Sequence, residues 1–232
     1  MASLATSMPT IFVPAVDLLP WGTRWSVKNA FSKKEGMDFG KVFDQAVAKS
    51  LASMLGGIPV IKPKSTQLHP SKPDCVELGD TRIIGGIRPQ NYDCAYRPDG
   101  VRIAFDSKTL NDAKSIKKNW QNMINDLATE SSTVHTRFPY AISAFMVIIP
   151  QPALALAQEQ ALIRTLERMA TRVHVTDEAH LAEVISLVVW DPTHGSISAT
   201  TPAADSALHI DNFSEIVFER YVERYKGLPP HD

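Results

Sequence analysis

The segment 91–110 constrains the fold of this chain most tightly, because it reads as two short strands joined by a turn. Arg97-Pro98-Asp99-Gly100 is a turn sequence, since proline presets φ at the second position while aspartate and glycine suit the third and fourth. Residues 92–96 and 101–105, on either side, are rich in the β-branched and aromatic residues that favour strands. The sequence therefore predicts a β-hairpin that reverses at residues 97–100.

This hairpin would gather two carboxylates and one lysine at its open end. A reversal at residues 98–100 places Asp93 near Asp106, at the end of the ladder furthest from the turn. Side chains alternate along a strand, so Asp106 and Lys108 lie on the same face. Two carboxylates this close repel each other unless a cation lies between them, and Mg²⁺ prefers oxygen ligands. We therefore expect a metal site at Asp93 and Asp106, with Lys108 beside it.

The composition is that of a globular protein. A chain of 232 residues can form one substantial domain or two small ones, and its 44% hydrophobic and 21% charged residues argue against disorder. The longest apolar run, around residues 144–150, is too short to span a bilayer, and the proline-broken N-terminus lacks the basic region of a signal peptide. Cys75 and Cys94 cannot alone supply a four-ligand zinc site or a secreted disulfide framework. A cytoplasmic protein with no membrane partner is the expectation.

The charge is unevenly distributed along the chain. The net charge is −1, but residues 1–120 carry 17 Lys and Arg against 11 Asp and Glu, whereas residues 121–232 carry 7 against 14. A basic half that also contains the predicted metal site would suit a polyanionic substrate such as a nucleic acid. A chance asymmetry of solvent-exposed faces explains the same numbers equally well.

Apolar residues recur with a helical or strand period over most of the chain after residue 37. Helices are expected over residues 38–55, 110–127, 158–173 and 211–226, and strands over residues 81–87, 140–149 and 184–190 in addition to the hairpin. This order of elements is typical of an α/β fold in which helices flank a mixed central β-sheet. Residues 1–37 show little periodicity, so we expect an irregular N-terminal arm followed by a single domain over residues 38–232.

An acidic residue on one strand, Asp93, followed on the next by Asp106-Ser107-Lys108, resembles the signature of the PD-(D/E)xK nuclease superfamily. The resemblance covers the hairpin and, more loosely, residues 38–150. It implies a restriction-endonuclease-like core over about residues 38–150, with residues 151–232 as C-terminal additions. It also implies a Mg²⁺-dependent endonuclease of the restriction–modification type, in which Mn²⁺ could substitute for Mg²⁺. The implied substrate is double-stranded DNA, and a palindromic target would call for a homodimer.

The resemblance also assigns roles at the site. Asp93, Asp106 and the backbone carbonyl of Ser107 would bind the metal, and Lys108 would orient the attacking water and stabilise its hydroxide form. Many members carry a further acidic ligand after an aromatic residue on the preceding helix. Phe43-Asp44 resembles that pair, so Asp44 either completes the ligand set or faces solvent.

The identity of the first acid has an alternative. The literal Pro-Asp pair is Pro98-Asp99, but it falls in the predicted turn and points away from Asp106. Asp93 is therefore favoured over Asp99. Glu77 and Asp80 lie just before the predicted strand 81–87 and are further carboxylates near the site.

The helix after the hairpin supplies the candidate DNA contacts. Its polar face carries Lys117, Lys118 and Gln121, which either contact the DNA backbone or form an ordinary solvated surface. No P-loop, dinucleotide-binding glycine motif, serine nucleophile motif or HExxH zinc motif is present. Two alternatives to a restriction-like enzyme remain open at this stage: a non-catalytic nucleic-acid-binding or assembly protein on the same fold, and a repair or structure-specific nuclease.

Overall fold

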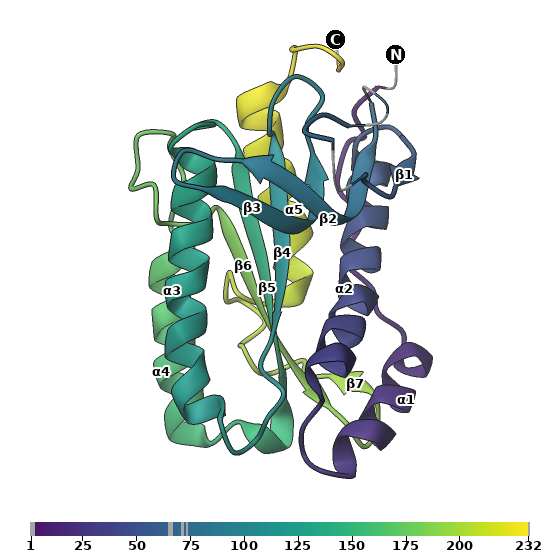
Figure 1. The fold of residues 1–232 in the computed structure, drawn as a ribbon, viewed down its shortest axis with the longest axis vertical. Helices are drawn as coiled ribbons and strands as arrows, with labels where there is room; N and C mark the ends of the chain where they lie inside the picture. The colour runs from purple at the N-terminus through teal and green to yellow at the C-terminus, as the bar shows by residue number, and fades with distance from the viewer. Residues whose placement is uncertain (1–2, 65–66, 71, 73, 232) are drawn as a thin grey trace.

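The computed structural model describes residues 3–64, 67–70, 72 and 74–231, and within them five α-helices surround a seven-stranded sheet (Figure 1). The elements in chain order are α1 (Ala15–Ser26), α2 (Lys33–Met54), β1 (Val60–Ile61), β2 (Val76–Ile84), β3 (Pro89–Tyr96), β4 (Ile103–Thr109), α3 (Ile116–His135), β5 (Ile142–Pro150), a 3-10 turn (Gln151–Ala153), α4 (Leu156–Met169), β6 (Val184–Asp191), β7 (Ser196–Ile197) and α5 (Ile210–Tyr225). Among these described elements, no helix is both long and apolar enough to cross a membrane.

The sheet is mixed, as the sequence predicts, and its strands follow one another in chain order from β1 to β7. The strands β2, β3 and β4 form an antiparallel meander, whereas β4, β5 and β6 run parallel. Parallel neighbours need a crossover connection, and α3 and α4 provide the two that join β4 to β5 and β5 to β6. The prediction of an α/β fold with a mixed central sheet is therefore confirmed.

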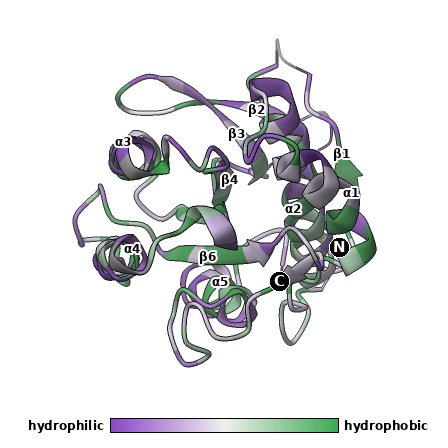
Figure 2. Ribbon diagram, turned by 90° about the horizontal axis from the view of Figure 1, so that it is seen from below, coloured by the Kyte–Doolittle hydropathy of each residue, from purple (hydrophilic) through white to green (hydrophobic). Residues whose placement is uncertain are grey.

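Helices cover both faces of the sheet. Figures 1 and 2 show α3 and α4 on one side and α1 and α2 on the other. The helix α5 packs on the α2 side, since the ring of Phe213 contacts that of Phe105 on β4. Between the two layers every residue of β5 is buried, as expected for a central strand covered on both faces. Alternate residues of β4 therefore face different helices, which matters for the site.

The helix α2 begins at Lys33, earlier than its periodicity alone predicts, because a capping box fixes its start. The hydroxyl of Ser32 accepts from the backbone N–H of Glu35, and the Glu35 carboxylate accepts from the backbone N–H of Ser32. Its buried apolar face, spaced one turn apart, consists of Phe39, Phe43, Val47 and Leu51. This face anchors α2 against the sheet.

Two glycines let α2 lie unusually close to β4. A Cβ atom added to Gly36 would lie 2.7 Å from the side chain of Asn111, and one added to Gly40 would lie 3.1 Å from the hydroxyl of Ser107. Asp44 follows Gly40 after one further turn. Gly36, Gly40 and Asp44 therefore form a ridge, called the inner ridge below, that faces the strand.

The expectation of an irregular arm before residue 38 is wrong, because residues Ala15–Ser26 form α1. Leu18 and Trp25 are buried, and the Trp25 indole N–H donates to the carbonyl of Asn111 at 2.6 Å. Pro14 precedes the helix and Pro20 lies within it, which hides the helical pattern at the level of sequence.

The helix α3 differs from its expected range of 110–127. It begins only at Ile116, and it continues to His135 through a serine- and threonine-rich turn. The hydroxyls there are satisfied inside the helix: those of Thr129, Ser132 and Thr133 each donate to a carbonyl one turn back at 2.8 Å. Residues 110–115 form a loop instead, and this loop borders the pocket described below.

A buried ionic cluster centred on Glu183 joins Arg172 and Arg224 at the start of β6. The Glu183 carboxylate accepts from Arg172 at 3.0 Å, from Arg224 at 2.8 Å and from the backbone N–H of Ser143 at 2.8 Å. The guanidinium groups of Arg172 and Arg224 also donate to several backbone carbonyls. The carboxylate thus connects α5 to the strands.

We predict that Glu183→Ala destabilises the protein strongly, because it leaves two buried guanidinium groups without their anion. The expected loss is about 3–5 kcal/mol in the free energy of unfolding, measured by urea denaturation. Glu178→Ala is the matched control, since the side chain of Glu178 is exposed. Similar losses in the two variants would show that the cluster contributes nothing specific.

Candidate active site

The hairpin forms as predicted, and it brings Asp93 and Asp106 to the point where its strands separate. The β3–β4 ladder pairs Tyr96 with Ile103, Ala95 with Ala104 and Cys94 with Phe105, so its continuation sets Asp93 opposite Asp106. The regular β3–β4 ladder ends at Cys94 and Phe105, and beyond it β4 continues in register with β5.

A bulge in β2 lies beside this end of the ladder. Leu78 pairs with Cys94 and Thr81 with Tyr92, so Gly79 and Asp80 together stand opposite Asp93. Gly79 has a φ of +116°, which only glycine adopts readily. Bulges of this kind bend a strand and re-aim side chains next to functional sites.

Asp93 accepts hydrogen bonds from β4 beyond the end of the ladder. The N–H of Ser107, which has no partner strand on this side, donates to Asp93 Oδ2 at 3.0 Å, and the Ser107 hydroxyl donates to the same oxygen at 3.2 Å. These two bonds fix the Asp93 carboxyl over the open end of the hairpin.

Asp93 and Asp106 are called the carboxyl pair below, and they lie within hydrogen-bonding reach of each other. Burial, and after it the charge of Asp106, raise the pKa of Asp93 to about 8. Burial raises the pKa of Asp106 to about 6, although its hydrogen bond with Asp93 and the charge of Lys108 act in the opposite direction. Both carboxyl groups therefore favour a bound proton more than ordinary aspartates do, and a cation could take the place of that proton.

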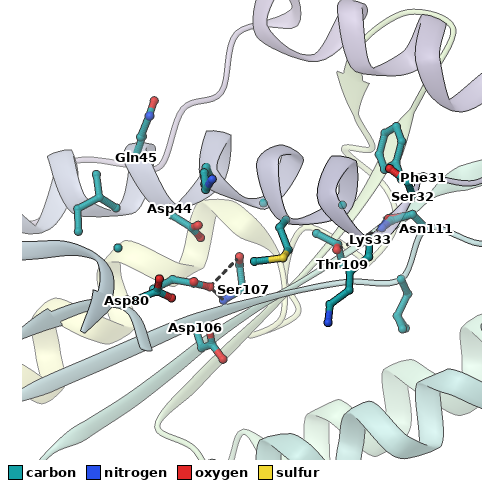
Figure 3. Close-up of a pocket in the computed structure, with 18 of the residues that line it drawn as sticks. Phe31, Ser32, Lys33, Asp44, Gln45, Asp80, Asp106, Ser107, Thr109 and Asn111 are labelled. Carbon is teal, nitrogen blue, oxygen red and sulfur yellow. Dashed lines mark hydrogen bonds between the residues drawn. The ribbon is translucent and has the colours of Figure 1, made fainter. Parts of the chain in front are cut away.

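Asp44 faces the same place from the helix above. Its side chain is buried, its Oδ1 has no hydrogen-bond partner among the described residues, and the Ser107 hydroxyl lies within hydrogen-bonding reach. Figure 3 shows Asp44 on α2 directed toward Ser107 on β4. Burial, and then the charge of Asp93, raise the pKa of Asp44 well above its ordinary value. The alternative of a solvent-facing Asp44 is therefore wrong.

Lys108 is held between two carboxylates on the opposite face of β4. Its ammonium donates to Asp106 and, at 2.8 Å, to Oε1 of Glu130 on α3. Burial alone would lower the pKa of Lys108, but the charges of Asp106 and Glu130 outweigh that effect and raise it above its ordinary value. Lys108 therefore stays an ammonium that can donate hydrogen bonds and stabilise negative charge, and it cannot serve as a base.

Glu130 is a site residue that sequence reasoning missed. Its Oε1 also accepts from Gln90 at 3.0 Å, and its backbone carbonyl accepts from the hydroxyl of Tyr92 at 2.9 Å, so β3 and α3 hold it jointly. One sequence feature could have identified it. Glu130 interrupts the helical series of buried residues formed by Met123, Leu127 and Val134, and a carboxylate on an apolar face calls for a partner.

The other candidate acids have different roles. Asp99 is exposed in the turn, where its carboxylate accepts a hydrogen bond from Arg102 Nε at 2.9 Å. It is therefore not the partner of Asp106. Glu77 lies inside β2 and is buried in an ion pair with Arg97, with a Nη2–Oε1 distance of 3.0 Å. Asp80, by contrast, is exposed and lines the pocket beside the carboxyl pair.

The predicted DNA contacts on α3 are not brought to the site. Lys118 and Gln121 are exposed, and neither lines the pocket. The side chain of Lys117 lies outside the described residues. Because α3 begins later than expected, its first turn presents Ser115 and Asn119 to the pocket instead.

The carboxyl pair opens into a pocket of about 910 Å³. Its walls come from α2, from β1 and β2, from β4, and from residues 109–119. Figure 3 shows Asp44, Asp80 and Ser107 at one end and Phe31, Ser32 and Asn111 at the other. The lysines on its walls are Lys33, Lys41 and Lys62.

The donor set fits a hard divalent cation. Across the residues that the structure describes, no group of three or more His, Cys, Asp or Glu side chains is arranged as a ready-made metal site. The carboxyl pair nevertheless places two acids in mutual contact, and the partnerless oxygen of Asp44 faces them. Such oxygen ligands suit Mg²⁺. The amide and hydroxyl of Ser107 are turned to Asp93, and the role of its carbonyl as a ligand stays a prediction.

Comparison of the chain with protein-family models, with curated proteins and with solved structures finds no significant match. The arrangement of Asp44, Asp93, Asp106, Lys108 and Glu130 is therefore what bears on function.

We predict that Asp93 makes the metal-free protein less stable as the pH rises from about 4 to about 8. An unfolded aspartate has a pKa of about 3.9, whereas that of Asp93 in the fold is raised to about 8, so between these values the folded state binds more protons. The contribution of Asp93 to the free energy of unfolding then falls with rising pH. Thermal denaturation in EDTA across this range measures the effect.

Asp93→Asn should remove much of this pH dependence and raise stability at pH 8 by about 1–3 kcal/mol. Asp99→Asn is the control, because Arg102 lowers the pKa of Asp99 and its loss should act in the other direction. A pH profile unchanged by Asp93→Asn would contradict the raised pKa of Asp93 in the carboxyl pair.

Proposed function

We propose that this protein is a metal-dependent phosphodiesterase that hydrolyses DNA, with Mg²⁺ as its cofactor and Mn²⁺ as a substitute. The observation that carries the proposal is the meeting of Asp93, Asp106 and Lys108 at the open end of the hairpin, with Asp44 facing them. Two acids and an ammonium beside a pocket are the set that the PD-(D/E)xK resemblance requires.

The order of elements supports the same proposal. One helix, three antiparallel strands, a second helix and a strand parallel to the third occur in sequence as α2, β2, β3, β4, α3 and β5. This is the αβββαβ order of a restriction-endonuclease-like core. The antiparallel meander creates the carboxyl pair, and the crossover through α3 brings Glu130 beneath Lys108.

Asp93 and Asp106 would hold the metal ion, with Asp44 as a further oxygen ligand. A bound Mg²⁺ supplies positive charge to a phosphodiester and lowers the pKa of a water molecule. The raised pKa values of Asp93 and Asp44 indicate that both acids lack a cation partner of their own in the fold. The carboxyl groups would accordingly bind the ion in exchange for their protons.

Lys108 would act on the attacking water and on the phosphate. Its ammonium is fixed by two carboxylates yet keeps about a fifth of its side chain exposed, at 21%. It would donate a hydrogen bond that orients the water and would stabilise the negative charge that develops on it. Because Lys108 stays protonated, the proton of the water has to leave to another acceptor.

Several finer predictions are part of this proposal. The resemblance implies a restriction-like enzyme, and a homodimer if its target is palindromic. A cytoplasmic location also stays a prediction. The alternative is a non-catalytic nucleic-acid-binding or assembly protein on the same fold, which would bind no divalent ion and cut no nucleic acid.

We predict that Asp106→Asn and Lys108→Ala each reduce Mg²⁺-dependent cleavage by about 10²–10⁴-fold. The first removes a charged ligand of the metal ion, and the second removes the ammonium that acts on the water and the phosphate. Supercoiled plasmid and labelled single-stranded, duplex and branched oligonucleotides, each with Mg²⁺ or with EDTA, supply the assay. Asp99→Asn should cleave normally. Cleavage undiminished by either substitution would remove the assignment, and no cleavage of any substrate by the wild type would favour the binding protein.

We also predict that Glu130→Gln lowers kcat by about 10–100-fold while KM and the affinity for Mg²⁺ change little. The amide keeps the shape of Glu130 but loses the charge that holds Lys108 in position. Glu130→Asp should recover part of the rate. If Glu130→Gln instead weakened Mg²⁺ binding as much as Asp106→Asn does, Glu130 would belong to the metal site and not to the positioning of Lys108.

A further inference from the structure

We propose that the strand bound at this site is single-stranded DNA, which lies along α2 with an unpaired base in the pocket. This inference rests on the proposed function, because it names the substrate class of the same site, and it replaces the double-stranded DNA that the resemblance implies. It comes from the side chains that α2 presents to the pocket.

The outer side of α2 carries a second ridge that lines the pocket. Lys33, Met37, Lys41 and Gln45 follow one another at four-residue spacing, all four are exposed, and all four line the pocket. Successive members lie about 6 Å apart along the helix axis, so the two lysines are about 12 Å apart. This set is called the outer ridge below. It alternates a cation, an apolar thioether, a second cation and an amide.

The alternation matches the chemistry of one polynucleotide strand. Lysines neutralise phosphates, whereas an exposed thioether and an amide can contact a base. Met37 keeps 59% of its surface exposed, so its thioether is accessible to a base. Lys41 forms an ion pair with Asp38 on the surface, at 2.7 Å, and a phosphate can replace such a weak partner.

The wall opposite the outer ridge suits a base. The loop and first turn of α3 present the apolar side chains of Leu110 and Ile116 together with the amides of Asn111 and Asn119. Phe31 closes the far end of the pocket, as Figure 3 shows. Apolar walls with a few polar groups are typical of small planar ligands.

The charges are separated along the pocket. Asp44, Asp80 and the carboxyl pair gather at one end, where the metal ion would lie. Asp112, at the other end, accepts a hydrogen bond from the backbone N–H of Lys114 at 3.0 Å and so belongs to its own turn. A phosphate would thus meet cations along the outer ridge and the ion at the acidic end.

The shape of the pocket favours a single strand over a duplex. A base can enter it only after leaving the stack, which costs a duplex a few kcal/mol and costs a single strand much less. A volume of about 910 Å³ has room for a nucleotide or two, so a base that occupies the pocket is unpaired. The carboxyl pair lies in this same pocket, so a strand seated along the outer ridge with its base in the pocket brings a phosphate to the pair.

The test is binding of a fluorescein-labelled oligothymidylate and of its duplex with oligoadenylate, followed by fluorescence anisotropy. All proteins carry Asp106→Asn and are kept in EDTA, so that no cleavage interferes. The single strand is expected to bind at least tenfold more tightly. The double variant Lys33→Glu/Lys41→Glu should lose that binding by about tenfold or more and should reduce the salt slope by about 1–2, because two phosphate contacts are removed.

The matched control is Lys34→Glu/Lys49→Glu, which changes the same charge on exposed α2 residues that do not line the pocket. Met37→Ala should weaken binding without changing the salt slope. Equal effects of the two lysine pairs, or duplex binding as tight as single-strand binding, would overturn the inference. Ridge-dependent binding with a wild type that cuts nothing would sustain the inference and reject the nuclease, whereas duplex cleavage indifferent to the ridge would do the reverse.

Discussion

The structure depends on two carboxyl groups that are forced together where β3 and β4 separate. In an extended chain Asp93 and Asp106 would stay apart, and their charges oppose the contact. The turn at residues 97–100, the ladder beyond it and the bulge at Gly79 and Asp80 impose that contact. The opposing charge is then compensated by a shared proton, by Lys108, or by an ion, and the chemistry of the site follows from that compensation.

The strand β4 is the element that joins the two sides of the molecule. Its odd-numbered residue Ser107 faces α2 and meets Asp44, whereas its even-numbered Lys108 faces α3 and meets Glu130. The period of two thus directs Ser107 to the helix layer that holds Asp44 and Lys108 to the layer that holds Glu130, while Asp106, on the same face as Lys108, contacts its ammonium. A sheet covered by helices on one face only could not provide both contacts.

The sequence was informative where the deciding interactions are local. Turn chemistry and strand alternation are enough to bring Asp93, Asp106 and Lys108 together, because all three lie within one hairpin. Glu130 depends on how far α3 extends and on which way it packs, which no local pattern states. The same cause misplaced Lys118 and Gln121: they lie on the exposed face of α3, as the periodicity indicates, but where that face points relative to the site depends on packing. Prolines hid α1.

The inner ridge has a consequence for how ion and strand would influence each other. Gly36 and Gly40 press α2 onto β4, so Asp44 and the lysines of the outer ridge are parts of one rigid helix. A DNA strand that draws this helix closer to β4 would also bring Asp44 closer to the ion. Linkage then requires reciprocity: loading of the ion would raise the affinity for the strand by the same factor.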